Sequence, residues 1–79
     1  MTHRYTIRRL DAGCWIDVVE FTSDTEVKDA GEEIRRRMLC GEIAIASRKA
    51  LFCIAERLPN GREHHIGKDV AVDSNGKIL

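Results

Sequence analysis

Between Ser23 and Gly41, hydrophobic positions recur at the spacing of one face of an α-helix. This stripe consists of Val27, Gly31, Ile34 and Met38, with Ala30 beside it. Ser23 and Glu26 have the S-x-x-E spacing of a capping box, and Gly41 stands where a left-handed glycine would end the helix. The pattern therefore predicts one amphipathic helix over residues 23–41.

The charged residues of this segment are placed to support that helix. Glu32 precedes Arg36 by four residues and Glu33 precedes Arg37 by the same spacing, the favourable order for intrahelical ion pairs. Acidic residues lie in the first turn and arginines toward the last, as the helix dipole prefers. The run Arg35–Arg37 is therefore explained by a solvated helix face, with contacts to phosphate or to a protein partner as alternatives.

Two alternating segments before the helix predict a β-hairpin. Arg4–Leu10 places Tyr5 and Ile7 on one face, and Cys14–Phe21 is rich in β-branched and aromatic residues. Residues 11–13 between them form a turn, with a glycine where a positive φ would be needed.

The second strand of this hairpin has two unequal faces. We expect its core face to consist of Cys14, Ile16 and Val18. Trp15 would then lie on the opposite face, beside Asp17.

The segment after Gly41 allows two interpretations. Glu42–Ala46 alternates as a short strand, and residues 47–49 form a turn. Ala50–Leu58 fits one face of a strand, and residues 47–58 fit a second helix equally well. Residues 59–61, Pro-Asn-Gly, are typical of a hairpin turn and favour the strand, paired with Arg62–Ile66.

The C-terminal residues predict two further short strands. Val70–Val72 is a short apolar run, residues 73–76 form a turn, and Lys77–Leu79 pairs back as an edge strand. The whole chain, residues 1–79, is expected to be one α+β domain of ββαβββ-like order. Its small antiparallel sheet has about four to five strands and one amphipathic helix on one face.

Charge and cysteine content indicate the cellular compartment of the protein, but they do not indicate its activity. Thirteen basic and thirteen acidic residues cancel, so no overall field attracts nucleic acid or an anionic membrane. No apolar run approaches the roughly 20 residues that span a bilayer, and the charged N-terminus does not resemble a secretory signal. Three cysteines without a C-x-x-C pair favour reduced thiols. We expect a cytoplasmic protein that does not enter the membrane.

Residue types that could support chemistry do not form a recognisable site. His64 and His65 are adjacent on a predicted strand, so they point to opposite faces and do not readily share a metal. Cys53 could approach either histidine across the hairpin, but nothing in the pattern orients such a pair for nucleophilic catalysis. We predict no enzymatic activity, no cofactor and no metal.

The remaining candidates are side chains favoured at protein interfaces and on phosphates: Tyr5, Arg8, Arg9, Trp15, Arg35, Arg36, Arg37 and Arg57. The chain's size, its neutral but charge-rich composition and its α+β order resemble small phage-encoded proteins that inhibit bacterial defence complexes of the CRISPR type. This resemblance covers the whole chain. It is a resemblance of architecture, and no sequence motif supports it. The leading hypothesis is a non-catalytic interaction or regulatory module that binds a larger protein or complex. A homodimer is a special case, and a nucleic-acid-binding module is the alternative.

Overall fold

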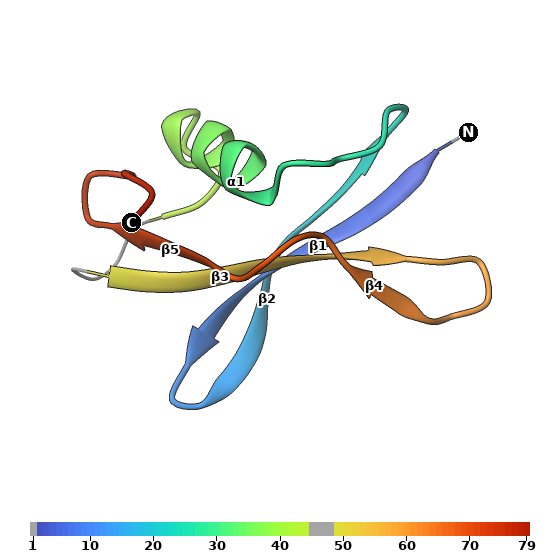
Figure 1. Ribbon diagram of the computed structural model, residues 1–79, viewed down its shortest axis with the longest axis horizontal. Coiled ribbons are helices and arrows are strands. Elements are labelled where there is room, and N and C mark those ends of the chain that lie inside the picture. The colour runs from blue at the N-terminus through green and yellow to red at the C-terminus, as the bar shows by residue number, and fades with distance from the viewer. Residues whose placement is uncertain (1, 45–48) are drawn as a thin grey trace.

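A five-stranded antiparallel sheet and one helix form the described part of the chain, residues 2–44 and 49–79, in a computed structural model (Figure 1). The strand order is β2-β1-β3-β4, and β5 also pairs with β3. The expected α+β class and its ββαβββ-like order are confirmed. The elements are β1 (His3–Asp11), β2 (Cys14–Ser23), α1 (Ala30–Leu39), β3 (Lys49–Arg57), β4 (Glu63–His65) and β5 (Val70–Asp73).

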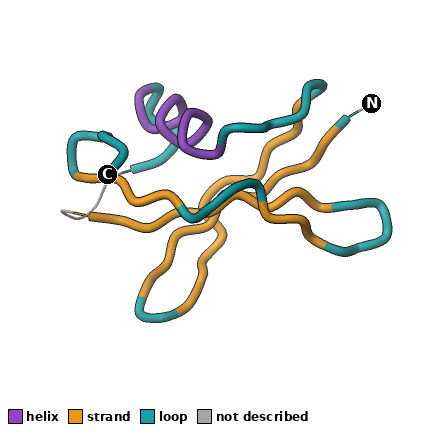
Figure 2. Tube along the Cα trace, viewed as in Figure 1, coloured by secondary structure: helices purple, strands orange, loops and turns teal. Residues whose placement is uncertain are grey.

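The first two strands form the predicted hairpin, which projects away from α1 (Figure 2). Its turn consists of Ala12 and Gly13, with φ angles of 51° and 80°. Two successive residues with positive φ are the mark of a type I′ turn, whose twist matches that of the strands it connects. Glycine supplies the second of these angles without steric cost.

A β-bulge at Val18 shifts the core face by one position in the C-terminal half of β2. Ile7 pairs with Val19 and Arg8 pairs with Asp17, so Val18 is the extra residue. Past the bulge the alternation of faces is displaced by one position. Cys14 and Ile16 lie on the same face of the sheet as Ile7, but the prediction that they are part of the core is wrong. Both are exposed, because this end of the hairpin extends beyond Arg9, the last residue of β1 that pairs with β3. The residues of β2 that pack against the core are Val18, Val19 and Phe21.

The start of the helix also differs from the prediction. Ser23 is the last residue of β2, and the N-cap is Asp29, whose side chain accepts a hydrogen bond from the Glu32 amide at 3.1 Å. Between them the chain runs without helix, and the Val27 amide donates to the Tyr5 hydroxyl at 2.8 Å. The capping box therefore does not form, because the register with β1 extends β2 through Ser23.

The end of the helix agrees with the prediction. Gly41 has a φ of 85°, and its amide donates to the Met38 carbonyl. The amide of Glu42 donates to the Arg37 carbonyl at 2.9 Å. These two bonds form a Schellman motif, which satisfies carbonyls that the last turn leaves without partners.

The ambiguous segment after the helix is a strand, so the second-helix alternative is wrong. β3 pairs with β1 on one side and with β4 and β5 on the other. Gly61 has a φ of 85° in the turn that leads to β4, as the Pro-Asn-Gly pattern predicted. The strand predicted over Glu42–Ala46 is not seen at residues 42–44, where Ile43 is buried in the core. Residues 45 and 46, and residues 47 and 48 of the predicted turn, lie outside the described residues.

The chain does not continue as a simple meander after β4. It returns to β3, and β5 pairs with the N-terminal half of that strand. Gly76 has a φ of 82° in the turn that follows, and Val72 forms a bridge with Ile78. The predicted edge strand at the C-terminus is thus reduced to this one bridge.

The core lies between α1 and one face of the sheet. Helix positions Ala30, Ile34 and Met38 recur every four residues and face it. The largest fully buried side chains are Tyr5, Ile7, Ile34, Ile43, Phe52, Ile54 and Val72. Among the described residues, no helix has the length and apolar character needed to cross a membrane.

Candidate interaction surface

Tyr5 is not part of the accessible surface. Only 1% of its surface is exposed, and its ring stacks on that of Phe21 with 5.2 Å between the ring centres. Its hydroxyl accepts a hydrogen bond from the Val27 amide. Burial raises the pKa of this hydroxyl, so it remains protonated. The prediction of Tyr5 as an exposed contact residue is therefore wrong, because its strand face is covered by the segment that leads to α1.

Arg8 is held between two carboxylates on the face of the sheet opposite α1. Its guanidinium donates to Asp17 at 2.8 Å and to Glu63 at 2.5 and 2.9 Å. These hydrogen bonds raise the pKa of Arg8, and the bond from Arg8 lowers the pKa of Glu63. Because the side chain links β2 to β4, it crosses β3, where Cys53 and Ala55 are buried. Arg8 therefore has a structural role.

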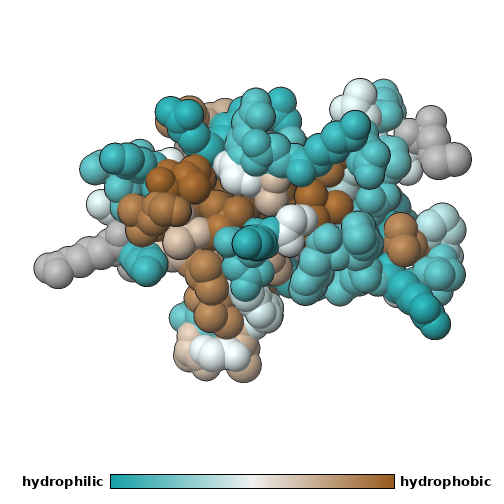
Figure 3. Space-filling view, in the orientation of Figure 1, coloured by the Kyte–Doolittle hydropathy of each residue, from teal (hydrophilic) through white to brown (hydrophobic). Residues whose placement is uncertain are grey.

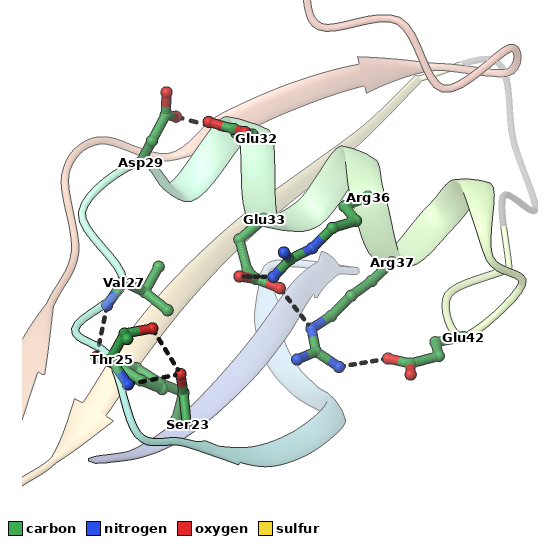
Figure 4. Close-up of polar contacts among 10 residues, drawn as sticks. Ser23, Thr25, Val27, Asp29, Glu32, Glu33, Arg36, Arg37 and Glu42 are labelled. Carbon is green, nitrogen blue, oxygen red and sulfur yellow. Dashed lines mark hydrogen bonds and ion pairs between the residues drawn. The ribbon is translucent and has the colours of Figure 1, made fainter. Parts of the chain in front are cut away.

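Two of the three consecutive arginines are bound within the helix (Figure 4). Glu33 accepts from Arg36 at 2.5 Å and from Arg37 at 2.9 Å, and Arg37 also pairs with Glu42. The predicted Glu33–Arg37 pair is confirmed, whereas Arg36 bonds Glu33 in place of Glu32. The guanidinium of Arg37 also lies 3.6 Å from the centre of the Phe21 ring, a cation–π contact that joins α1 to β2.

The other predicted contact residues are dispersed over the surface. Arg35 is exposed and lines a groove with Leu39, Lys77 and Ile78. Arg57 lies directly opposite Arg4 across the β1–β3 pair, where both line a groove with Glu20. Like charges opposite one another are unfavourable, and both side chains reach into solvent.

The tip of the β1–β2 hairpin carries three of the exposed large hydrophobic side chains. Leu10 and Trp15 are cross-strand neighbours with 38% and 39% of their surface exposed, and Ile16 is 42% exposed. Trp15 was identified from sequence, but Leu10 and Ile16 were not. Their exposure follows from the hairpin extending beyond the last residue of β1 that pairs with β3, Arg9, and no local pattern indicates that position.

A groove opens where the hairpin tip and β3 separate. It has a volume of about 560 Å³. Apolar residues Leu10, Leu51 and Ala71 line it together with charged residues Arg9, Asp11 and Lys49. Figure 3 shows hydrophobic surface that continues from the region of α1 and β5 down to the hairpin. We call Leu10, Trp15, Ile16 and this groove the tip surface.

The outer edge of β2 is the second prominent feature of this hairpin. β2 is the terminal strand of the sheet order, and within the described residues it pairs only with β1. Between Asp11 and Val27 the chain has five acidic residues and no basic one: Asp11, Asp17, Glu20, Asp24 and Glu26. Two of these residues, Asp17 and Glu20, lie on β2, so the charged side chains of this edge strand are both acidic, although the whole chain is neutral.

The cysteines and histidines are dispersed, with Cys40 at the C-terminal end of α1 and Cys14, Cys53, His64 and His65 on strands of the sheet. Cys53 is buried, and burial raises the pKa of its thiol, which disfavours the reactive thiolate. His64 pairs with Glu56 and His65 with Ala55, so the two rings leave opposite faces as predicted. In the residues that the structure describes, no group of three or more His, Cys, Asp or Glu side chains could hold a metal.

Comparison with known proteins finds no family model, no curated protein and no solved structure that matches this chain.

Proposed function

We propose that this chain is a non-catalytic interaction or regulatory module that binds a larger protein or protein complex through its outer surface. The observation that carries the proposal is the tip surface. Leu10, Trp15 and Ile16 lie on a projecting hairpin (Figure 1). Their side chains are exposed to water and are not part of the hydrophobic core. Aromatic and large aliphatic side chains in such positions are typical anchors of protein interfaces.

The ion pairs of the arginines support this proposal over nucleic-acid binding. Arg8, Arg36 and Arg37 each bond a carboxylate, so these bonds would compete with phosphate contacts. A nucleic-acid module would show affinity for RNA or DNA that falls linearly with the logarithm of salt concentration. Absence of any shift with RNA or DNA at low salt removes that alternative.

The setting in this proposal is the cytoplasm. Cys14, Cys40 and Cys53 are free, and two of them are exposed, which suits a reducing compartment. Inhibition of a bacterial defence complex by a phage-encoded protein is one specific form of the proposal. It predicts that the chain retains one large bacterial complex rather than a collection of small proteins.

The test is affinity capture from the cell of origin with matched surface variants. The double variant Leu10→Ser/Trp15→Ala removes the apolar side chains of the tip surface, and Leu39→Ser makes a similar change on the exposed end of α1. We expect the wild type and Leu39→Ser to retain the same partner and the double variant to lose it. Equal retention by all three proteins, or no retained protein, would contradict the proposal.

A homodimer is the narrower alternative within this class. Light scattering on the eluted protein over micromolar concentrations separates the two, because a self-associating module changes mass with concentration while a monomer does not.

A further inference from the structure

The free edge of β2 offers backbone hydrogen-bonding groups to another strand. In an antiparallel pair, every second residue directs its N–H and C=O groups away from its partner. β2 is ten residues long, and its one partner strand in the described part of the chain is β1. An open edge of this length is a template for pairing with an additional strand.

The side chains along this edge define what kind of strand would fit. Asp17 and Glu20 lie on the face opposite α1, because they pair with Arg8 and Thr6 of β1. Ile16 and Val19 lie on the other face. The bulge at Val18 brings the two acids to the same face although three positions separate them.

We propose that the free edge of β2 accepts an extended segment of a partner protein in which basic and apolar residues alternate. Its lysines or arginines would lie beside Asp17 and Glu20, and its apolar residues beside Ile16 and Val19. This inference rests on the proposed function and names the chemistry of the partner. Alternation with period two follows from the pleat, and opposite charges on neighbouring strands stabilise the pairing.

Asp17 and Glu20 can each form an ion pair with a basic residue of an added strand. Within the described residues Glu20 has no ion-pair partner, and it is exposed. The Asp17 side chain bonds Arg8 but remains 60% exposed, and Arg8 also has Glu63. A cation from an added strand would therefore add charge complementarity without breaking an existing pair.

A second copy of the chain is a poorer occupant of this edge. β2 contains two acids and no base, so a second β2 supplies no cation to Asp17 or Glu20. Charged residues and bulges on edge strands are the usual devices that prevent such self-pairing. The same features leave the edge open to a strand of the opposite charge.

The test uses short synthetic peptides as probes and fluorescence anisotropy as the readout. The probe is a fluorescein-labelled peptide in which lysine and valine alternate. A second peptide has the same composition with its lysines and valines in two blocks. A third has the alternating sequence with N-methyl groups on the backbone amides of one edge, and a peptide methylated on the other edge completes the set.

We expect saturable binding of the alternating peptide and at least about tenfold weaker binding of the block peptide. At least one N-methylated peptide is expected to lose binding by a similar factor, because strand addition depends on backbone hydrogen bonds. Binding should also weaken as salt is added.

A matched pair of protein variants locates the binding. Glu20→Lys reverses a charge on the free edge, and Glu32→Lys makes the same change on the exposed side of α1. We expect about tenfold weaker binding for Glu20→Lys and no change for Glu32→Lys. Circular dichroism establishes that both variants keep the fold.

Three results would overturn the inference. These are equal binding of the block and alternating peptides, equal effects of the two variants, and undiminished binding of both methylated peptides. A dimer in light scattering that the alternating peptide does not dissociate would also overturn it, because a second copy would then occupy the edge. If the peptide fails but capture still depends on Leu10 and Trp15, the proposed function stands and only strand addition is lost.

Discussion

The two edges of this sheet are built from strands of different length. The far side of β3 is covered in turn by β4 and β5, which pair with its C-terminal and N-terminal halves. The far side of β2 has no strand against it in the described part of the chain. The C-terminal third of the chain thus places two short strands, of three and four residues, at one edge of the sheet, whereas the other edge is a single strand of ten residues.

The burial of the two strands explains this difference. β3 is buried on both faces, with Phe52 and Ile54 toward α1 and Cys53 and Ala55 on the other side. Its backbone groups are largely removed from water, so each needs a partner within the protein. β2 exposes most of its residues, and water can satisfy its outer backbone groups. A free edge is therefore tolerable only where the strand is accessible, and that same accessibility makes it available to a partner.

The largest contrast is expected from one substitution made on both strands. Ile54→Ala in β3 removes a fully buried side chain and should lower the free energy of unfolding by about 2 to 5 kcal/mol. Ile16→Ala in β2 removes an exposed side chain and should change it by less than about 0.5 kcal/mol. Urea denaturation of the two variants measures both values. Similar losses for the two would mean that the hairpin tip is packed rather than exposed.

The connection from β2 to α1 depends on the buried Tyr5 hydroxyl. Tyr5→Phe leaves the Val27 amide without its acceptor, so we expect a loss of about 1 to 3 kcal/mol in the free energy of unfolding. Thermal unfolding measures this loss. A change near zero would show that water replaces the hydroxyl and that the segment after β2 is not fixed by this bond.

The carboxylate of Glu33 holds Arg37 over Phe21 and so secures the C-terminal half of β2. Burial acts to raise the pKa of Glu33, but the hydrogen bonds and charges of Arg36 and Arg37 outweigh burial and lower it. A lowered pKa in the folded state adds stability above the unfolded pKa, which is about 4.3. That contribution is lost as the pH falls through the lower pKa of the folded protein.

Glu33→Gln should therefore lower the free energy of unfolding by about 1.5 kcal/mol near neutral pH, after allowance for the exposure of Arg36. The difference from wild type should shrink as the pH falls below about 4.3. Urea denaturation at a series of pH values measures it. A difference that stays constant down to acid pH would show that the charge of Glu33 has no part in stability.

The smallest effect distinguishes the two candidate caps. Asp29→Ala removes the side chain that accepts the Glu32 amide and should cost about 1 kcal/mol. Ser23→Ala removes only two exposed hydrogen bonds to Thr25 at the end of β2 and should be nearly neutral. The opposite order in thermal unfolding would place the start of the helix at Ser23.

Local patterns in the sequence predicted several elements of this fold well. The Pro-Asn-Gly turn identified the β3–β4 hairpin, and Gly41 identified the end of α1. Ser23 and Glu26 were misleading, because pairing with β1 determines where β2 ends, and this pairing is not visible in a local spacing. The bulge at Val18 is likewise a property of two strands together, so it displaced the predicted core face.

The candidate surface was less predictable than the fold for the same reason. The residue type of Trp15 is enough to predict it as an exposed contact residue. The same prediction is wrong for Tyr5, because Tyr5 is buried by a segment that lies 22 residues further along the chain. The acidic edge could have been noticed as a run without basic residues from Asp11 to Val27. That the long strand β2 lies at an edge of the sheet depends on the strand order, which the sequence pattern left undetermined.

Residue-resolved amide hydrogen exchange on β2 tests the central claim most directly. In the free protein, alternate amides of β2 should exchange quickly, because they face solvent, while those of β3 remain protected. Addition of the alternating lysine–valine peptide should protect these fast amides of β2. Uniform protection of β2 in the free protein, or fast exchange that the peptide leaves unchanged, would contradict the account.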